Sequence, residues 1–376
     1  MCTYVKLDCY VMGGESLLAQ CAQMLQDRGH RILGVITASR DLARWAEGAG
    51  LPVLAPGRGL ADRVQPHDVF FSIANLRIVP DAVLAKARRG AVNFHDGPLP
   101  RYAGLNAPNW ALLKGETTHG VTWHRIEGGV DEGRVLARRP VEVQPLMTAF
   151  ELNAACYAAA IASFPEVLDR FEADDDRQAL GEKQDLSERS YFAKDDRPEA
   201  MGLIDWHSDG EAVVRLVRAL DYGPNYPSPL LFAKLVDAAG RVLLVRQASP
   251  ANASGTPGQV LEADGQGAVV ATAKGAVRIA ALTDLEGRPV SPAALAGQQL
   301  GTLDAESLTR LTRKNSDVVA AEGFWTKRLE SAAPFELGAI GRADTVRAAQ
   351  VALDGAGLEG DRWLAAMALG VARLAG

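Results

Sequence analysis

Residues 4–38 have the sequence YVKLDCYVMGGESLLAQCAQMLQDRGHRILGVITA, which joins two apolar runs through a stretch with helical spacing. The apolar runs cover residues 4–11 and 31–38, the length of buried strands, and the helical pattern covers residues 16–28. A second helical pattern follows at residues 41–49. Because apolar strands that alternate with helices are typical of a parallel sheet covered on both faces, we expect an α/β fold.

The alternation continues to about residue 171, followed by a charged stretch to residue 198 whose latter part we interpret as a linker. Strands are expected at residues 68–73, 90–94, 119–126 and 135–143, and helices at residues 81–86, 107–114 and 149–171. We therefore predict a Rossmann-like, mostly parallel sheet in a first domain, residues 1–190.

The second half of the chain changes character. After a helical pattern at residues 211–220, five short β-rich runs are separated by glycine, proline and asparagine: residues 229–236, 241–248, 258–263, 267–273 and 275–282. Short strands at this spacing predict a small β-barrel subdomain, residues 191–305. Charged and alanine-rich helical patterns follow, so we expect residues 306–376 to form a helical tail or the start of a following domain.

Composition excludes several classes of protein. A chain of 376 residues predicts two or three domains, and its 40 basic and 46 acidic residues give a formal net charge of −6, so a general polyanion binder is not indicated. The four cysteines form no CxxC pair, which argues against a disulfide scaffold or a thiolate metal site and favours a reducing cytoplasm. We expect neither a signal peptide nor a membrane segment.

Two common α/β functions lack their motifs. No strand-turn-helix carries GxGxxG or GxxxxGK[ST], so a nicotinamide oxidoreductase and a P-loop NTPase are not expected. The first turn has only Gly13 and Gly14, which fit either a tight turn or the close approach of a ligand.

The segment VNFHDGPLPRYAG, residues 92–104, carries the most specific chemical signal. Asn93 and His95 lie two residues apart on an expected strand, so both side chains point to one face. An Asn-x-His pair alone fits a structural histidine, but Asp131 follows in a glycine-flanked acidic turn that the sheet can bring to the same cleft. Asp96 and Glu132 are the neighbouring alternatives to Asp131.

The other histidines carry no comparable signal. His124 alternates with apolar residues and is interpreted as a surface or packing residue. The remaining histidines show no ligand spacing with one another, so we expect no metal.

Between Asn93 and Asp131 the sequence resembles the folate-dependent formyltransferase family, which includes methionyl-tRNA formyltransferase and the sugar N-formyltransferases. The matching pattern is Asn-x-His, a Leu-Pro turn, Arg-Tyr-x-Gly, Trp-Ala-Leu-Leu-x-Gly-Glu, Thr-His-Gly-Val-Thr and an aspartate in a glycine-rich turn. The resemblance extends upstream to IVPDAVL, residues 78–84, and downstream to about residue 303. It implies a Rossmann-like catalytic domain followed by a smaller barrel similar to the OB fold.

The resemblance also implies the reaction and its residues. The family's catalytic asparagine, histidine and aspartate fall on Asn93, His95 and Asp131, and the formyl donor is N10-formyltetrahydrofolate. Asparagine can donate a hydrogen bond to the developing oxyanion, histidine can relay a proton, and the carboxylate can orient the imidazole and stabilise its cation.

The family's pterin contacts are made by the main chain of two loops. By resemblance these contacts fall on Arg77, Ile78 and Val79 in one loop, and on Gly129 and Val130 in the turn before the catalytic aspartate.

Two differences from the family pattern bear on the molecule that accepts the formyl group. HDGPLPRYAG, residues 95–104, stands where the family often has a Ser-Leu-Leu-Pro turn, and Arg134 stands where it often has an acid. The variant resembles the formylation domains that open nonribosomal peptide synthetases, whose acceptor is an aminoacyl thioester on a carrier protein. The resemblance of the tail to the start of a following synthetase domain points the same way.

A charge count of residues 205–305 agrees with that acceptor. The span holds 8 basic and 10 acidic residues, a balance of 8 − 10 = −2, which disfavours a tRNA platform. Our main expectation is therefore an initiation domain of a peptide synthetase, with an aminoacyl carrier protein and downstream synthetase domains as partners. The alternatives are methionyl-tRNA formyltransferase, a catalytically silent folate-binding or docking module, and a hydrolase that releases formate.

Overall fold

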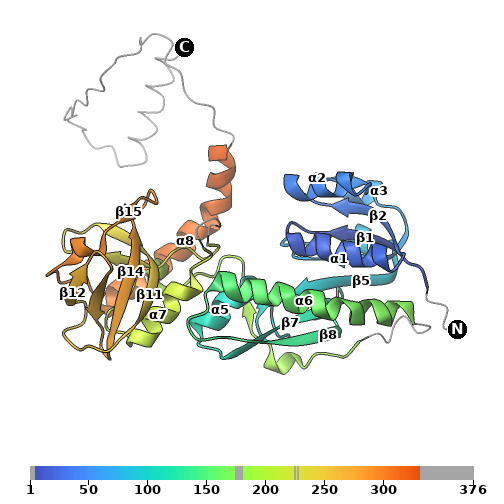
Figure 1. The fold of residues 1–376 in the computed structure, drawn as a ribbon. Helices are drawn as coiled ribbons and strands as arrows, with labels where there is room; N and C mark the ends of the chain where they lie inside the picture. The colour runs from blue at the N-terminus through green and yellow to red at the C-terminus, as the bar shows by residue number, and fades with distance from the viewer. Residues whose placement is uncertain (1–4, 174–180, 224–225, 227, 331–376) are drawn as a thin grey trace, which may run out of the picture. The chain divides into compact units, whose positions relative to one another are not determined.

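The computed structural model describes residues 5–173, 181–223, 226 and 228–330 (Figure 1). Residues up to Asp317 form one compact unit, and a second unit begins at Val318. Of the expected tail, the structure describes the helix α8 (Ala305–Glu330), and residues 331–376 lie outside the described residues. The boundaries expected at residues 190/191 and 305/306 stay predictions.

A seven-stranded sheet forms the centre of the first half (Figure 1). Its order is β3 (Val53–Leu54), β2 (Arg31–Ile36), β1 (Asp8–Met12), β4 (His67–Ser72), β5 (Ala87–His95), β7 (Thr118–Arg125) and β8 (Val135–Glu142). The first five strands are parallel, and β7 and β8 are antiparallel to their neighbours. The predicted Rossmann-like, mostly parallel sheet is confirmed.

Both faces of this sheet are covered, because alternate residues of β1 enter different cores. Cys9 and Val11 belong to the core built with α1 (Ser16–Asp27), α2 (Arg40–Gly48) and α6 (Ala149–Glu172). Tyr10 and Met12 belong to the core on the other face, with α3 (Leu60–Arg63) and α4 (Asp81–Leu84).

Local signals explain two boundaries near the site. The helix α6 begins after Thr148, whose side chain caps the backbone of Glu151 while the Glu151 carboxylate reaches back, a reciprocal capping box. After β1, a Cβ on Gly13 would lie 1.9 Å from the carbonyl oxygen of Ile73, so this turn requires glycine on steric grounds. Gly14 has open space around it.

A second, antiparallel sheet with its own core follows α7 (Gly210–Ala219). Its order is β10 (Lys234–Val236), β11 (Val242–Ala251), β14 (Ala276–Thr283), β13 (Gly267–Ala271) and β12 (Val260–Asp264), with β15 (Pro289–Val290) paired to β14. Short 3₁₀ turns flank it, η2 (Glu199–Gly202) and η3 (Pro292–Leu295). The five expected strands are present, together with the short β15. No helix in the described part of the chain is long and apolar enough to cross a membrane.

The segment interpreted as a linker is structured where it is described. It contains η1 (Leu186–Glu188) and β9 (Tyr191–Phe192), which pairs in parallel with β6 (Ala103–Gly104), just before α5 (Ala107–Leu113). The linker interpretation was wrong for this part because two-residue strands are held by partners far away in sequence, which leave no local pattern.

Candidate active site

The predicted catalytic residues lie at the carboxyl end of β5 and in the turn between β7 and β8. Asn93 and His95 project from one face of β5, while Phe94 between them packs in the opposite core against Trp123 and Tyr157. The antiparallel β7 pairs His124 with Asn93 and ends at Arg125 beside Val92, so the turn that carries Asp131 starts close to Asn93. The sheet therefore brings the three residues together as the sequence predicted.

His95 has its two ring nitrogens in different surroundings. Nε2 lies 2.7 Å from the carbonyl oxygen of Tyr102, which can only accept, so this nitrogen carries a proton and donates it. Nδ1 faces Asp131 Oδ2 at 3.6 Å and Asp96 Oδ1 at 3.9 Å. In the neutral ring Nδ1 therefore holds the lone pair and can take up a proton, and two carboxylates stand ready to stabilise the cation.

Asp131 is a buried carboxylate with several partners. Its Oδ2 accepts a hydrogen bond from the Gly104 N–H at 2.8 Å, and its Oδ1 lies 3.3 Å from His124 Nε2. Burial by itself would raise the pKa of Asp131, but the hydrogen bond with His124, the charges of His95 and His124 and the Gly104 N–H hold this pKa well below its usual range. These partners therefore favour the ionised form of Asp131. Its backbone is left-handed, with φ 58°, a conformation that aspartate tolerates among glycines.

Asn93 is oriented from both ends of its amide. Ser72 Oγ donates to Asn93 Oδ1 at 2.7 Å, and Asn93 Nδ2 lies 3.2 Å from His124 Nε2. The other nitrogen of His124, Nδ1, donates to the carbonyl oxygen of Arg125 at 2.9 Å, so Nε2 is the nitrogen that faces both the Asn93 amide and the Asp131 carboxylate. One N–H of Asn93 is then left for a substrate oxygen.

The interpretation of His124 as a surface or packing residue was therefore wrong. It is 2% exposed and lies between Asn93 and Asp131. Alternation along the strand correctly placed its side chain on the opposite face from Trp123, but the face that it shares with the site could be recognised only from strand pairing.

Two residues of the segment that was interpreted as a linker, Gln184 and Arg189, hold the turn that carries Asp131. Gln184 Nε2 donates to the carbonyl oxygens of Asp131 at 2.8 Å and Gly133 at 2.6 Å. Arg189 donates to the carbonyl of Val130 at 3.0 Å. Sequence reasoning missed these residues because each acts through main-chain groups more than 50 positions away.

The residues predicted to contact the pterin lie on two loops connected to this network. Asn75 holds Arg77 by accepting from its N–H at 3.1 Å and donating to its carbonyl at 2.9 Å, and it also donates to Ser72 at 3.1 Å. The next residue, Ile78, is 80% exposed, and Val79 is buried. A loop that is fixed at its base and presents an apolar side chain beside main-chain polar groups fits a flat heteroaromatic ring.

The second of these loops is the turn that carries Asp131. Gly129 donates its N–H to Glu132 at 3.2 Å, and Val130, which is 45% exposed, stands next to Asp131. Gly129 and Val130 thus lie in the same turn as the predicted catalytic carboxylate.

Two residues near the site serve packing. Asn109 is fully buried and donates to the carbonyl of Ala219 at 2.7 Å, and Trp110 stacks on Phe192 with ring centroids 4.7 Å apart. These contacts explain both residues without an acceptor-binding role.

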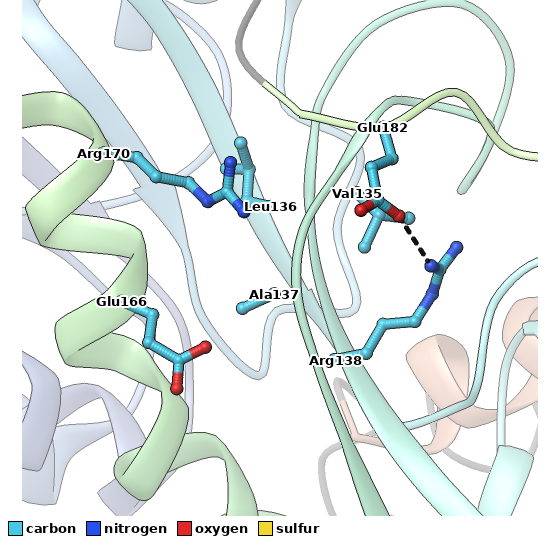
Figure 2. A pocket seen from close by; sticks show the side chains of 7 residues that line it. All are labelled: Val135, Leu136, Ala137, Arg138, Glu166, Arg170 and Glu182. Carbon is cyan, nitrogen blue, oxygen red and sulfur yellow. Dashed lines mark hydrogen bonds and ion pairs between the residues drawn. The ribbon is translucent and has the colours of Figure 1, made fainter.

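A separate pocket lies between β8 and α6 (Figure 2). Its lining pairs Arg138 with Glu182 at 3.2 Å and includes Glu166 and Arg170 on the helix. None of the three predicted catalytic residues lines it, and it holds no histidine, cysteine or serine, so we assign it no catalytic role. Within the described ranges, no group of three or more His, Cys, Asp or Glu residues could hold a metal ion.

Comparison with known proteins identifies the class. The family model described as "Formyl transferase" matches residues 60–168, and the model described as "Formyl transferase, C-terminal domain" matches residues 198–299. The chain belongs to the formyltransferase family.

Individual relatives share most of its length. Methionyl-tRNA formyltransferase of Thiobacillus denitrificans is 30% identical over 318 residues, covering 77% of this chain and 98% of that protein. Methionyl-tRNA formyltransferase of Geobacter metallireducens is 29% identical over 298 residues, covering 74% of this chain and 90% of that protein.

Solved structures share the fold. HypX from Aquifex aeolicus in complex with tetrahydrofolic acid matches with a TM-score of 0.54 and 23% identity. The match covers 77% of this chain and 46% of HypX, just under half of that protein. The N-formyltransferase from Helicobacter canadensis, in complex with folinic acid and dTDP-3-aminofucose, matches with a TM-score of 0.56 and 16% identity, covering 73% of this chain and 99% of that one.

The expectation of a formyltransferase is confirmed, and the expected fold class with it. The finer expectation of a peptide-synthetase domain finds no support among these relatives. The curated relatives carry instead the name that the sequence analysis gave as its alternative, and the argument against tRNA from charge finds no support there either.

Proposed function

We propose that this chain transfers the formyl group of N10-formyltetrahydrofolate to the amino group of an aminoacyl acceptor. The observation that carries the proposal is the meeting of Asn93, His95 and Asp131, with Asp131 Oδ2 3.6 Å from His95 Nδ1, in a member of the formyltransferase family. An amide donor, a proton relay and a fixed carboxylate are the groups that acyl transfer to an amine requires.

The three side chains divide the work. As the amine attacks the formyl carbon, the free N–H of Asn93 donates to the oxyanion that develops there. Nδ1 of His95 takes the proton that the attacking nitrogen must lose and delivers it to N10 as the bond from N10 to the formyl carbon breaks. Asp131 stabilises the imidazolium between these two transfers.

The loops beside the triad are proposed to hold the donor. The main-chain groups of Ile78 and Val79 make no hydrogen bond with other described residues and are available to the polar edge of a pterin. The exposed side chains of Leu76, Ile78 and Val130 would cover its faces. The structures of HypX with tetrahydrofolic acid and of the Helicobacter canadensis enzyme with folinic acid support this assignment.

Methionyl-tRNA is the first acceptor to test, because the curated relatives are named for it. An aminoacyl thioester on a carrier protein is the second candidate. It is favoured by one observation, the balance of 8 basic against 10 acidic residues in the span 205–305, since a surface that binds nucleic acid usually gathers positive charge.

A direct assay separates these readings. The protein is incubated with N10-formyltetrahydrofolate and either methionyl-tRNA or a methionyl carrier protein, and the N-formyl product and free formate are measured by mass spectrometry. Formyl product with wild type and its loss in His95→Ala support the proposal, and the productive acceptor identifies the substrate. Formate released without an acceptor would indicate a hydrolase. Tight folate binding with no product from either acceptor would indicate a silent binding module, and both outcomes contradict the proposal.

A further inference from the structure

We propose that Asp96 binds the acceptor as its ammonium ion and so selects a charged primary amine for the reaction. This inference rests on the proposed function and adds the residue that receives the second substrate. It begins with an asymmetry between the two carboxylates that face His95 Nδ1, Asp131 at 3.6 Å and Asp96 at 3.9 Å.

The two carboxylates differ in what they can still bind. Asp131 has a side chain 9% exposed and is occupied by His95, His124 and the N–H of Gly104. The side chain of Asp96 is 27% exposed, and among the described residues its carboxylate accepts no hydrogen bond and has only His95 as an ion-pair partner. A partly buried carboxylate without donors gains most from a cation that brings its own N–H groups.

Asp96 is held in place through its main chain. Its carbonyl oxygen accepts from His119 Nε2 at 2.7 Å, and His119 is 2% exposed and packs edge-on against Tyr102 at 5.8 Å between centroids. The residue follows directly after β5, which ends at His95. The main chain of Asp96 is therefore anchored beside the imidazole of His95, while its carboxylate oxygens remain available to a ligand.

The charge of Asp96 acts on two groups that are themselves largely buried. Burial first, and the negative charge of Asp96 second, raise the pKa of the Tyr222 hydroxyl and of the Cys156 thiol, which lies on α6. Neither group supplies positive charge to Asp96. The cation that this carboxylate lacks is the ammonium that an aminoacyl acceptor carries below the pKa of its amine, about 8 for a free α-amino group and lower beside an ester.

The ammonium must lose two protons in the reaction, and they leave by different routes. The ammonium held by Asp96 first releases one proton to water at the exposed edge of the carboxylate. The neutral amine then forms its bond to the formyl carbon, and the second proton passes through His95 Nδ1 to N10 as the bond from N10 to that carbon breaks. Asp96 thus acts on acceptor binding, whereas His95 acts on the transfer itself.

The test uses Asp96→Asn with whichever acceptor the wild-type protein formylates, methionyl-tRNA or the methionyl carrier protein. We expect the KM for that acceptor to rise about 10- to 100-fold, the effect of losing a hydrogen bond between charged groups, while the KM for N10-formyltetrahydrofolate stays within twofold. The matched control is Asp41→Asn, the same carboxyl-to-amide change at an exposed aspartate on α2 that pairs with Arg44, and it should leave the acceptor KM unchanged.

A pH series distinguishes binding of an ammonium from a structural effect. The ratio of the acceptor KM of Asp96→Asn to that of wild type should be largest below the pKa of the acceptor amine and should shrink as pH rises through it. Asp96→Glu, which keeps the charge, should recover part of the affinity. An acceptor KM that Asp96→Asn leaves unchanged, or a ratio that is constant with pH, would overturn the inference while the proposed function stands. Absence of product with wild type would refute the proposed function, and the inference with it.

Discussion

The change Asp131→Asn isolates the charge of the carboxylate that we propose to be catalytic, because asparagine has nearly the same shape. The amide oxygen can still accept from Gly104, whose N–H lies 2.8 Å from Asp131 Oδ2, so the turn should keep its conformation. What disappears is the interaction between a carboxylate and the imidazolium that forms on His95, 3.6 Å away.

Coulomb's law gives the size of the effect. Two unit charges 3.6 Å apart in surroundings with an effective dielectric constant of about 20 attract by about 4.5 kcal/mol. If the transition state carries between half and all of that positive charge, the barrier rises by about 2 to 4.5 kcal/mol, and kcat should fall by roughly 30- to 2,000-fold.

The assay measures formyl product under saturating donor and acceptor, at several pH values. Because the pKa of Asp131 lies well below its usual range, its carboxylate is ionised throughout the neutral range, and the comparison at each pH measures the loss of that charge. Asp41→Asn makes the same carboxyl-to-amide change at an exposed ion pair with Arg44 on α2 and should retain kcat within about threefold. A folded Asp131→Asn protein with kcat within fivefold of wild type would refute the electrostatic role.

Three further changes test the surroundings of the triad. Ser72→Ala removes the donor to Asn93 Oδ1 and should lower kcat about fivefold, the worth of one hydrogen bond, with the acceptor KM unchanged in steady-state kinetics. Gln184→Leu removes two hydrogen bonds to the catalytic turn and should lower the free energy of unfolding by about 1 to 2 kcal/mol in urea titrations; an unchanged value would mean that the turn holds itself. Burial lowers the pKa of His67 below its ordinary 6.5, so the folded state prefers the neutral ring and its contribution to stability is present above pH 6.5 and lost as pH falls. His67→Phe should therefore lose less stability than wild type between pH 7.5 and 5.5; an equal loss would contradict the assignment.

Sequence patterns predicted the parts of the fold that rest on local periodicity. The expected strand at residues 68–73 is β4 (His67–Ser72), and the expected helix at residues 149–171 is α6 (Ala149–Glu172). The first strand begins later than expected, at Asp8, because the apolar run includes residues before the point where pairing with β2 starts. A strand whose two faces are both buried has a continuous apolar sequence. Such a sequence predicts that a strand is present but not where it begins or ends.

For the candidate site, the sequence supplied the residues that could react and missed those that hold them. Asn93 and His95 were found because they share one strand face, a property of local sequence. His124 and Gln184 were not found, because a strand pairing and a hydrogen bond spanning 53 positions decide their roles. Such contacts depend on the assembled tertiary structure, and no pattern within a single sequence encodes them.

The brace supplied by Gln184 and Arg189 has a practical consequence for anyone who shortens this protein. A fragment that stops at the end of α6 would contain Asn93, His95 and Asp131, yet it would leave the carbonyls of the catalytic turn without their donors. Such a fragment should retain the reactive groups but not their alignment. The smallest piece worth expressing therefore ends beyond β9, well past the last residue that takes part in the chemistry.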